Sequence, residues 1–176
     1  MKLNLKLPQL FIVAIFSIVA FSCSSDDGDN DSSSIEGVPS GEIVPTELRN
    51  EALTGFFSET PIDGETQKWW THIISNFDFS SDECGDDFSI EDQGFIAFYP
   101  DGNYYQKFSI GGNPSQLGSW EWSNSSHSRI TVYTQGLEQE FTVTYLNEDN
   151  VVYGSVQSAS GCSVTTYEQF NNPHYE

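Results

Sequence analysis

Two hydrophobic patterns divide the chain. Residues 7–22 form one uncharged, largely apolar stretch, whereas the sequence after Leu53 contains many short apolar and aromatic runs separated by turn residues. Within these runs apolar and polar positions often alternate, as where Phe141, Val143 and Tyr145 are separated by threonines. Alternation of this kind is typical of antiparallel strands with one buried and one exposed face. No stretch after Leu53 has a helical period of useful length, which argues against a parallel sheet with crossover helices.

The short runs predict a closed meander of strands. The clearest hairpin is centred on Pro100-Asp101-Gly102, where proline pre-sets the turn and glycine can adopt a positive φ. We expect an all-β fold, an antiparallel up-and-down barrel of about eight to ten strands, because closure removes exposed sheet edges. The runs lie approximately at residues 55–60, 68–77, 88–90, 94–99, 104–110, 118–122, 129–133, 140–146, 151–157 and 163–170.

One short helix is expected before the strands. Thr46 offers an N-cap to residues 47–53, and Gly55 is placed to end the helix. Leu48, Ala52 and Gly55 have the spacing of one helical face. We expect this short helix to close one end of the domain that follows.

The first residues have the features of an export signal. Lys2 and Lys6 precede the uncharged stretch, which has 16 residues, fewer than the roughly 20 that a helix needs to span a bilayer. The segment from Ala20 to Cys23, Ala-Phe-Ser-Cys, resembles a bacterial lipobox, although Ala20 replaces the usual leucine and Phe21 is bulky. The resemblance implies that Cys23 is lipidated and becomes the mature N-terminus. An uncleaved anchor helix is the alternative.

The segment after Cys23 is rich in serine and aspartate. Residues 24–31 offer no apolar side chain to bury, so we expect a flexible tether. They resemble the acidic export signal of Bacteroidota-type surface lipoproteins. This resemblance implies an outer-membrane protein that is held by its lipid and faces outward, with the periplasmic face as the alternative. A calcium loop is disfavoured because no closing glutamate follows. The predicted organisation is a signal peptide (1–22), a lipidated tether and linker (23–50), a barrel domain (51–171) and a tail (172–176).

The charge of the chain restricts its partners. The formal net charge is −20, from 26 acidic and 6 lysine or arginine residues, and no basic stripe is present. Such a surface repels phosphate backbones, so we expect no nucleic-acid partner. Solubility alone is a sufficient explanation of the acidity, and a neutral, cationic or metal-bearing partner is the alternative. We expect a monomeric domain whose contact with the membrane is the lipid on Cys23.

The remaining cysteines and the histidines are the candidates for a disulfide, a redox pair or a metal site. Cys84 and Cys162 form an even pair in an exported chain, which predicts a disulfide; a metal or redox thiol pair is the alternative, without a Cys-x-x-Cys motif or adjacent histidine to favour it. His72, His127 and His174 are scattered, so we expect no metal site. No nucleophile elbow or phosphate loop is present, and we expect neither a cofactor nor enzyme activity.

Four short motifs occur in an order that resembles the lipocalin-like domain of small bacterial lipoproteins. Phe57 stands where that family has an opening tryptophan. Over residues 51–171 the resemblance implies an up-and-down barrel with room for an apolar molecule, but it supplies no defined ligand and no catalytic residues. The motifs are Leu53-Thr54-Gly55-Phe56-Phe57, Cys84-Gly85-Asp86-Asp87-Phe88, Phe98-Tyr99-Pro100-Asp101-Gly102-Asn103-Tyr104 and Gly118-Ser119-Trp120-Glu121-Trp122.

Aromatic residues are the candidate ligand contacts. Trp69 and Trp70 are adjacent, so on a strand one ring points inward and the other outward. We expect a lipid-anchored binding module that holds a small apolar or aromatic-stacking ligand. The alternatives are a filled barrel whose rings only form the core, and a carbohydrate-binding module that uses an outer aromatic face. The candidate contacts are Trp69, Trp70, Tyr105, Trp120 and Trp122, and we expect the last two inside the barrel.

Overall fold

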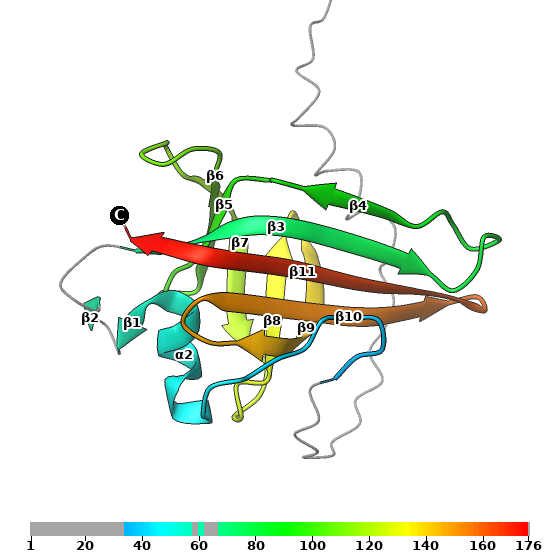
Figure 1. The fold of residues 1–176 in the computed structure, drawn as a ribbon, viewed down its shortest axis with the longest axis horizontal. Helices are drawn as coiled ribbons and strands as arrows, with labels where there is room; N and C mark the ends of the chain where they lie inside the picture. Colours follow the sequence, from blue (N-terminus) through cyan, green and yellow to red (C-terminus); the bar gives the residue numbers. More distant parts are fainter. Residues whose placement is uncertain (1–33, 58–59, 62–66, 176) are drawn as a thin grey trace, which may run out of the picture.

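The protein is a closed antiparallel barrel preceded by one short helix. The computed structural model describes residues 34–57, 60–61 and 67–175. Eight positions follow one another around the barrel in sequence order, as predicted (Figure 1). The strands are β3 (Lys68–Phe79), β4 (Phe88–Glu91), β5 (Phe95–Phe98), β6 (Asn103–Lys107), β7 (Ser115–Trp122), β8 (Arg129–Thr134), β9 (Leu137–Leu146), β10 (Asn150–Ala159) and β11 (Cys162–Tyr175).

The first and last strands of the barrel close the sheet. β11 pairs with β10 on one side and with β3 on the other, along most of its length. β4 and β5 share one position, since both pair antiparallel with β3, β4 near its end and β5 near its beginning. The run predicted at residues 55–60 is a separate two-stranded ribbon of β1 (Phe56–Phe57) and β2 (Thr60–Pro61).

The helix α2 (Thr46–Thr54) confirms the predicted element but corrects its cap and its buried face. Pro45, not Thr46, is the N-cap, and no side chain caps the first turn. Gly55 ends the helix as expected, with φ of 79° in the left-handed region. Leu48 is 42% exposed, whereas Leu53 is fully buried. The face that packs on the barrel is therefore the one that carries Leu53.

The barrel has two unlike ends. α2 lies at the end where β3 begins, and the Lys68 ammonium donates hydrogen bonds to the carbonyls of Ala52 and Glu148 there. The predicted hairpin also lies at this end, and Gly102 has the expected positive φ of 82°. The opposite end carries the β3–β4 connection and the β10–β11 turn, both at the right of Figure 1. These are called the helix end and the open end below.

An aromatic cluster fills the half of the barrel next to the helix. Trp70 and Phe98 are fully buried, and Phe98 contacts Trp120 edge to face with ring centroids 5.4 Å apart. The Trp70 indole N–H donates to the Leu53 carbonyl at 2.8 Å, which ties the cluster to the end of α2. An indole thus occupies the helix end, although Phe57 stands at the usual tryptophan position of the motif.

Two bulges change which side chains face inward. On β3, Gln169 pairs with Ile74 and Phe170 with His72, so Ile73 is the extra residue. On β7, Leu117 is the extra residue, because the residues on either side of it pair with Tyr104 and Tyr105. A bulge shifts the alternation of the strand by one residue. After Ile73 the inward positions of β3 are therefore odd-numbered.

The predicted disulfide is present at the open end. Cys84 and Cys162 are bonded, with Cα atoms 5.5 Å apart, and they link the β3–β4 connection to the start of β11. Cys23 and the predicted signal peptide and acidic segment lie outside the described residues. Within the described ranges, no helix combines the length and the apolar character needed to pass through a bilayer.

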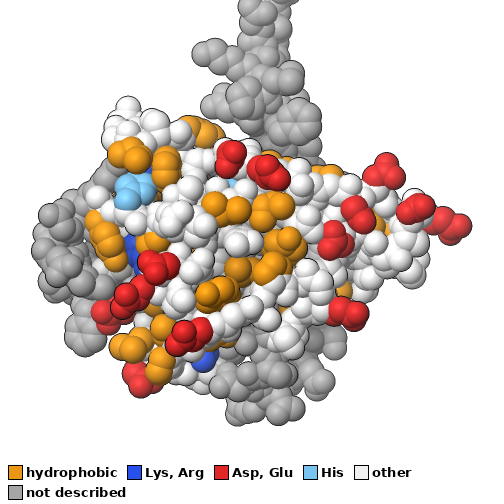
Figure 2. All heavy atoms as spheres, in the orientation of Figure 1, with side chains coloured by type: hydrophobic (Ala, Val, Ile, Leu, Met, Phe, Trp, Pro, Cys, Tyr) orange, Lys and Arg blue, Asp and Glu red, His pale blue; other side chains and the backbone are white. Residues whose placement is uncertain are grey.

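Acidic side chains are spread over the surface. On the face shown in Figure 2, Asp and Glu side chains are scattered among apolar and uncharged polar ones, and few basic side chains are visible. Arg49 is buried and donates hydrogen bonds to the carbonyls of Val44 and Ser126. Its charge therefore stabilises the helix end and does not offset the acidic surface. Lys107 is also buried, with its ammonium 4.1 Å from the ring centre of Trp69.

Candidate functional site: a cavity in the open half of the barrel

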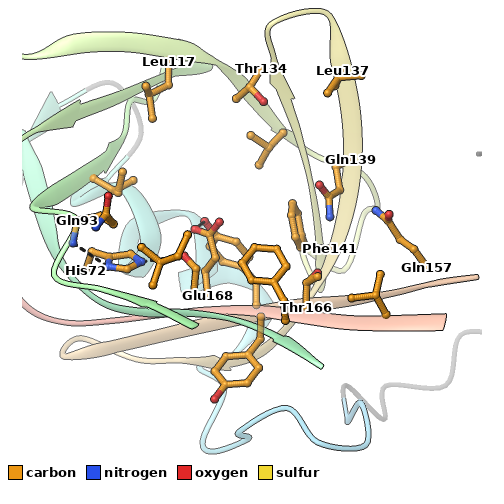
Figure 3. Close-up of a pocket in the computed structure, with 18 of the residues that line it drawn as sticks. His72, Gln93, Leu117, Thr134, Leu137, Gln139, Phe141, Gln157, Thr166 and Glu168 are labelled. Atoms are coloured by element: carbon orange, nitrogen blue, oxygen red, sulfur yellow. Dashed lines mark hydrogen bonds between the residues drawn. The ribbon is translucent and has the colours of Figure 1, made fainter. Parts of the chain in front are cut away.

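The open half of the barrel encloses a cavity of about 570 Å³. Side chains from every position around the barrel contribute to its wall, and Figure 3 shows Glu168, Phe141 and Gln139 projecting into the enclosed space. A volume of this size lies within the range of about 300–1,000 Å³ that is usual for small-molecule sites. The barrel is therefore filled at the helix end and hollow at the open end.

The wall of the cavity toward the open end is largely apolar. Phe77 and Phe88 stack with ring centroids 4.5 Å apart, and Phe88 remains 40% exposed. Leu117 enters this wall because of the β7 bulge, and Leu137 faces it from β9. Exposed residues such as Phe88 and Glu138 lie at the rim, so the cavity opens at the end opposite the helix.

The floor of the cavity is polar and centred on Glu168. Tyr153 pairs with Glu168 across β10 and β11, and its hydroxyl donates to Glu168 Oε2 at 2.9 Å. Since that proton is engaged, the neighbouring Tyr104 hydroxyl, 3.5 Å away, is the donor to Tyr153. Burial raises the pKa of Glu168 to about 6, opposed by the Tyr153 hydrogen bond. The carboxyl is therefore mostly ionised at pH 7.

His72 lies on the same floor as a neutral side chain. Its Nδ1 accepts the backbone N–H of Gln93 at 3.1 Å, so Nε2 carries the proton and donates to Ser75 Oγ at 2.9 Å. Burial lowers the pKa of His72 to about 4, and the charge of Asp92 opposes this only in part. The Ile73 bulge makes this pair possible, because it turns both His72 and Ser75 inward.

Neutral hydrogen-bonding groups complete the wall between floor and rim. Gln139 donates to Ser155 Oγ at 3.2 Å, and the Ser155 and Thr166 hydroxyls are 3.0 Å apart. Gln106 donates to the Gln93 carbonyl at 2.8 Å. Each of these groups therefore has at least one hydrogen-bond partner within the protein.

The five sequence-predicted contacts lie elsewhere in the structure. Trp70 is fully buried in the aromatic cluster, and Trp69 is 3% exposed, edge to face with Tyr99. Tyr105 also contacts Tyr99. Trp120 is buried, as expected, and Trp122 is partly buried against the core. None of the five lines the cavity.

Trp120 and Trp122 instead border a shallow hollow on the outside of the helix end, together with Asp101. Both indole N–H groups are engaged: Trp120 donates to the Tyr99 carbonyl, and Trp122 donates to Asn50 Oδ1. An aromatic face with free polar groups, which a sugar site needs, is therefore only partly provided here.

The cavity residues that the sequence analysis missed could be found by counting along β11. Phe170 is a plain core residue, and counting back by two from it gives Glu168, then Thr166 and Val164, all of which line the cavity. The signal is weak, because Thr166 and Glu168 make the cavity face of β11 polar and the opposite face is more polar still. His72 lies in the strand run predicted at residues 68–77, but its pairing with Ser75 depends on a bulge.

Comparisons with protein-family models, with curated proteins and with solved structures find no match for this chain. The geometry of the fold is by itself compatible with a lipocalin-like barrel. The barrel has eight antiparallel positions in sequential order, it is closed, and it contains a buried aromatic cluster.

The cavity joins a polar floor to a largely apolar wall. Within the described parts of the chain, no three His, Cys, Asp or Glu side chains are grouped so that they could hold a metal ion. Glu168 and Tyr153 form a hydrogen-bond acceptor and donor beneath an apolar wall. Such an arrangement can hold a molecule that has one polar end and an apolar body.

Proposed function

We propose that this protein is a non-enzymatic binding protein that holds one small apolar or amphiphilic molecule in the barrel cavity. The cavity of about 570 Å³ is the observation that supports it, because a filled barrel has no such space. Apolar side chains at the rim and a polar floor favour a ligand that enters with its polar end first.

The proposal includes a lipid anchor at Cys23. The lipobox-like Ala20–Cys23 segment and the following serine- and aspartate-rich residues support attachment to the outer membrane, with the barrel displayed as a monomer at the surface. The acidic surface supports the absence of a nucleic-acid partner. Native mass spectrometry of the protein from its source membrane would report both acyl chains on Cys23 and any molecule retained in the barrel.

The binding function is tested with a neutral fluorescent probe. We expect the full-length chain to bind N-phenyl-1-naphthylamine saturably at one site. Leu117→Trp places a larger side chain in the cavity wall and should weaken the probe at least tenfold, since the added ring occupies ligand volume. Fluorescence titration is the measurement.

Gln116→Trp is the matched control for this titration. Gln116 is the neighbour of Leu117 on β7, is exposed and does not line the cavity, so this variant should bind the probe like the unsubstituted protein. Equal affinity in all three proteins, or no saturable binding at all, would show that the cavity is not a ligand site.

A further inference from the structure

The cavity holds a carboxylate that no basic side chain of the described residues neutralises. Its lining residues include no lysine or arginine. Within residues 34–57, 60–61 and 67–175, Tyr153 is the side chain that donates a hydrogen bond to Glu168. An ionised carboxylate enclosed by protein is unfavourable unless it is paired, so a cationic partner at this position would recover free energy.

The other titratable groups around Glu168 do not supply that cation. His72 on β3 is neutral, with one ring nitrogen accepting from Gln93 and the other donating to Ser75. Burial raises the pKa values of Tyr104 on β6 and Tyr153 on β10 far above the usual tyrosine range, so both remain uncharged. Tyr167 on β11 also has a raised pKa because of partial burial.

The charge at the rim has the same sign as the charge on the floor. Glu138 on β9 is exposed and borders the cavity mouth. The formal net charge of the whole chain is −20. A negative field at the mouth raises the local concentration of cations and repels anions, which disfavours fatty acids and other anionic amphiphiles.

The surroundings of Glu168 suit a cation that carries an apolar chain. The rings of Tyr104, Tyr153 and Phe141 line the cavity beside the carboxylate, and aromatic rings attract ammonium groups. Above them apolar side chains such as Phe77 and Leu117 alternate with neutral polar ones, and Glu138 at the rim is the charged side chain of this part of the lining. A deep ammonium and a tail directed toward the mouth satisfy both parts of the cavity.

We infer that the cavity selects amphiphilic amines: the ligand's ammonium group binds Glu168 beside the Tyr104 and Tyr153 rings, and its apolar tail extends toward the mouth. This inference rests on the proposed binding function and names the ligand class. No covalent step is involved, and the ligand is held by a charge-assisted hydrogen bond, ring contacts and apolar burial.

The inference is tested by calorimetric titration of the full-length chain with three probes of equal chain length, namely decylamine, decanol and decanoate, below their aggregation concentrations. At pH 7.5 decylamine should bind at least tenfold more tightly than decanol, because one hydrogen-bonded charge pair has about this effect. Decanoate should bind most weakly. The preference for decylamine should decrease as the pH falls from 7.5 to 5, as Glu168 gains a proton.

Glu168→Gln and Glu138→Gln test whether the ammonium group binds at the floor of the cavity or at its rim. Glu168→Gln keeps the shape of the side chain and should reduce decylamine binding to the level of decanol, while decanol itself is unaffected. Glu138→Gln should leave the preference nearly unchanged, because that side chain lies at the exposed mouth. If Glu138→Gln abolished the preference and Glu168→Gln did not, the ammonium would bind at the rim and the inference would be wrong.

The test distinguishes this inference from the proposed function on which it rests. If decanol binds as tightly as decylamine, the cavity binds amphiphiles without selecting amines, and only the inference fails. If none of the three probes binds, the proposed function fails as well. Circular dichroism of both variants ensures that a loss of affinity reflects the side chain and not unfolding.

Discussion

At the scale of single residues, Glu168 is held at a position where an uncharged side chain would be more stable. Its carboxyl lies on the floor of the cavity with one hydrogen bond from Tyr153, and burial raises its pKa from 4.5 to about 6. The folded state therefore binds this proton more tightly than the unfolded chain does. The stability that the protonated carboxyl contributes is present below pH 4.5 and is lost as the pH rises through 6.

We predict that Glu168→Gln stabilises the protein at neutral pH. The raised pKa corresponds to about 2 kcal/mol, as an upper estimate, that the ionised carboxyl subtracts from the free energy of unfolding above pH 6. Glutamine can still accept the Tyr153 hydrogen bond. Urea unfolding of both proteins at pH 7.5 and pH 4 measures the effect.

The difference between the two proteins should be largest at pH 7.5 and small at pH 4. Comparison with the unsubstituted chain cancels the opposite contribution of His72, whose lowered pKa adds stability above pH 6.5 that is lost as the pH falls through about 4. A variant that is less stable at pH 7.5 would mean that the carboxylate has a stabilising partner in the folded state.

The burial of two tryptophans shows which side-chain positions can be predicted from sequence and which cannot. Trp120 could be placed inside from the alternation of β7, because a large apolar ring on a regular face has one favourable position. Trp69 could not be placed from sequence. Its neighbour Trp70 faces inward, yet Trp69 is also buried, because Lys107 of β6 and Tyr99, which follows β5, cover it. Such covering depends on contacts between residues far apart in the sequence.

At the scale of elements, strands were predictable and their bulges were not. The apolar runs of residues 129–133 and 151–157 correspond closely to β8 and β10 because turn residues delimit them. The extra residues Ile73 and Leu117 carry no local signal, since isoleucine and leucine are normal strand residues. The inward pair His72–Ser75 and the cavity position of Leu117 follow from those bulges, so this part of the site appears only in three dimensions.

The disulfide is the element-scale feature with the clearest thermodynamic consequence. Cys84 and Cys162 are 78 residues apart. In the loop-entropy model a crosslink of this length contributes about 4–5 kcal/mol by restricting the unfolded chain. We predict that Cys84→Ser combined with Cys162→Ser lowers the denaturation midpoint accordingly, as measured by guanidinium unfolding monitored by circular dichroism.

Reductant provides the control for this prediction. It should destabilise the unsubstituted protein to the level of the double variant and leave the double variant itself unchanged. A midpoint that does not respond to reductant would contradict the crosslink.

At the scale of the whole molecule, the fold was predictable because several patterns agree. Short alternating runs, regular turns and the lack of helical periods after Leu53 all favour sequential antiparallel strands, and closure of such a sheet leaves few alternatives. Whether the closed barrel is filled or hollow was not predictable. That depends on how far the rings of residues such as Trp70 and Phe98 reach, which is a matter of packing in three dimensions.

The net charge should make the stability of the whole molecule depend on salt. The formal charge is −20, and Arg49 and Lys68 direct their charges to backbone carbonyls. Repulsion among exposed carboxylates is screened as the Debye length falls from about 30 Å at 0.01 M salt to less than 8 Å above 0.15 M. We predict that 0.5 M NaCl raises Tm at pH 7.5 by about 2–4 °C, equivalent to about 1 kcal/mol.

Differential scanning calorimetry at pH 7.5 and near pH 4 tests the salt effect. Near the isoelectric point of about 4.1 the net charge is small, and the same addition of NaCl should change Tm little. An equal increase at both pH values would indicate a general salt effect and not relief of repulsion.

The division of the barrel into a filled half and a hollow half has a spectroscopic consequence. All 4 tryptophans, Trp69, Trp70, Trp120 and Trp122, lie outside the cavity lining, whereas Tyr104 and Tyr153 are part of it. Tryptophan fluorescence should therefore change when the native packing is lost but change little when a ligand binds in the barrel. The absorption of the Tyr104 and Tyr153 rings, which line the cavity, should instead respond to occupancy.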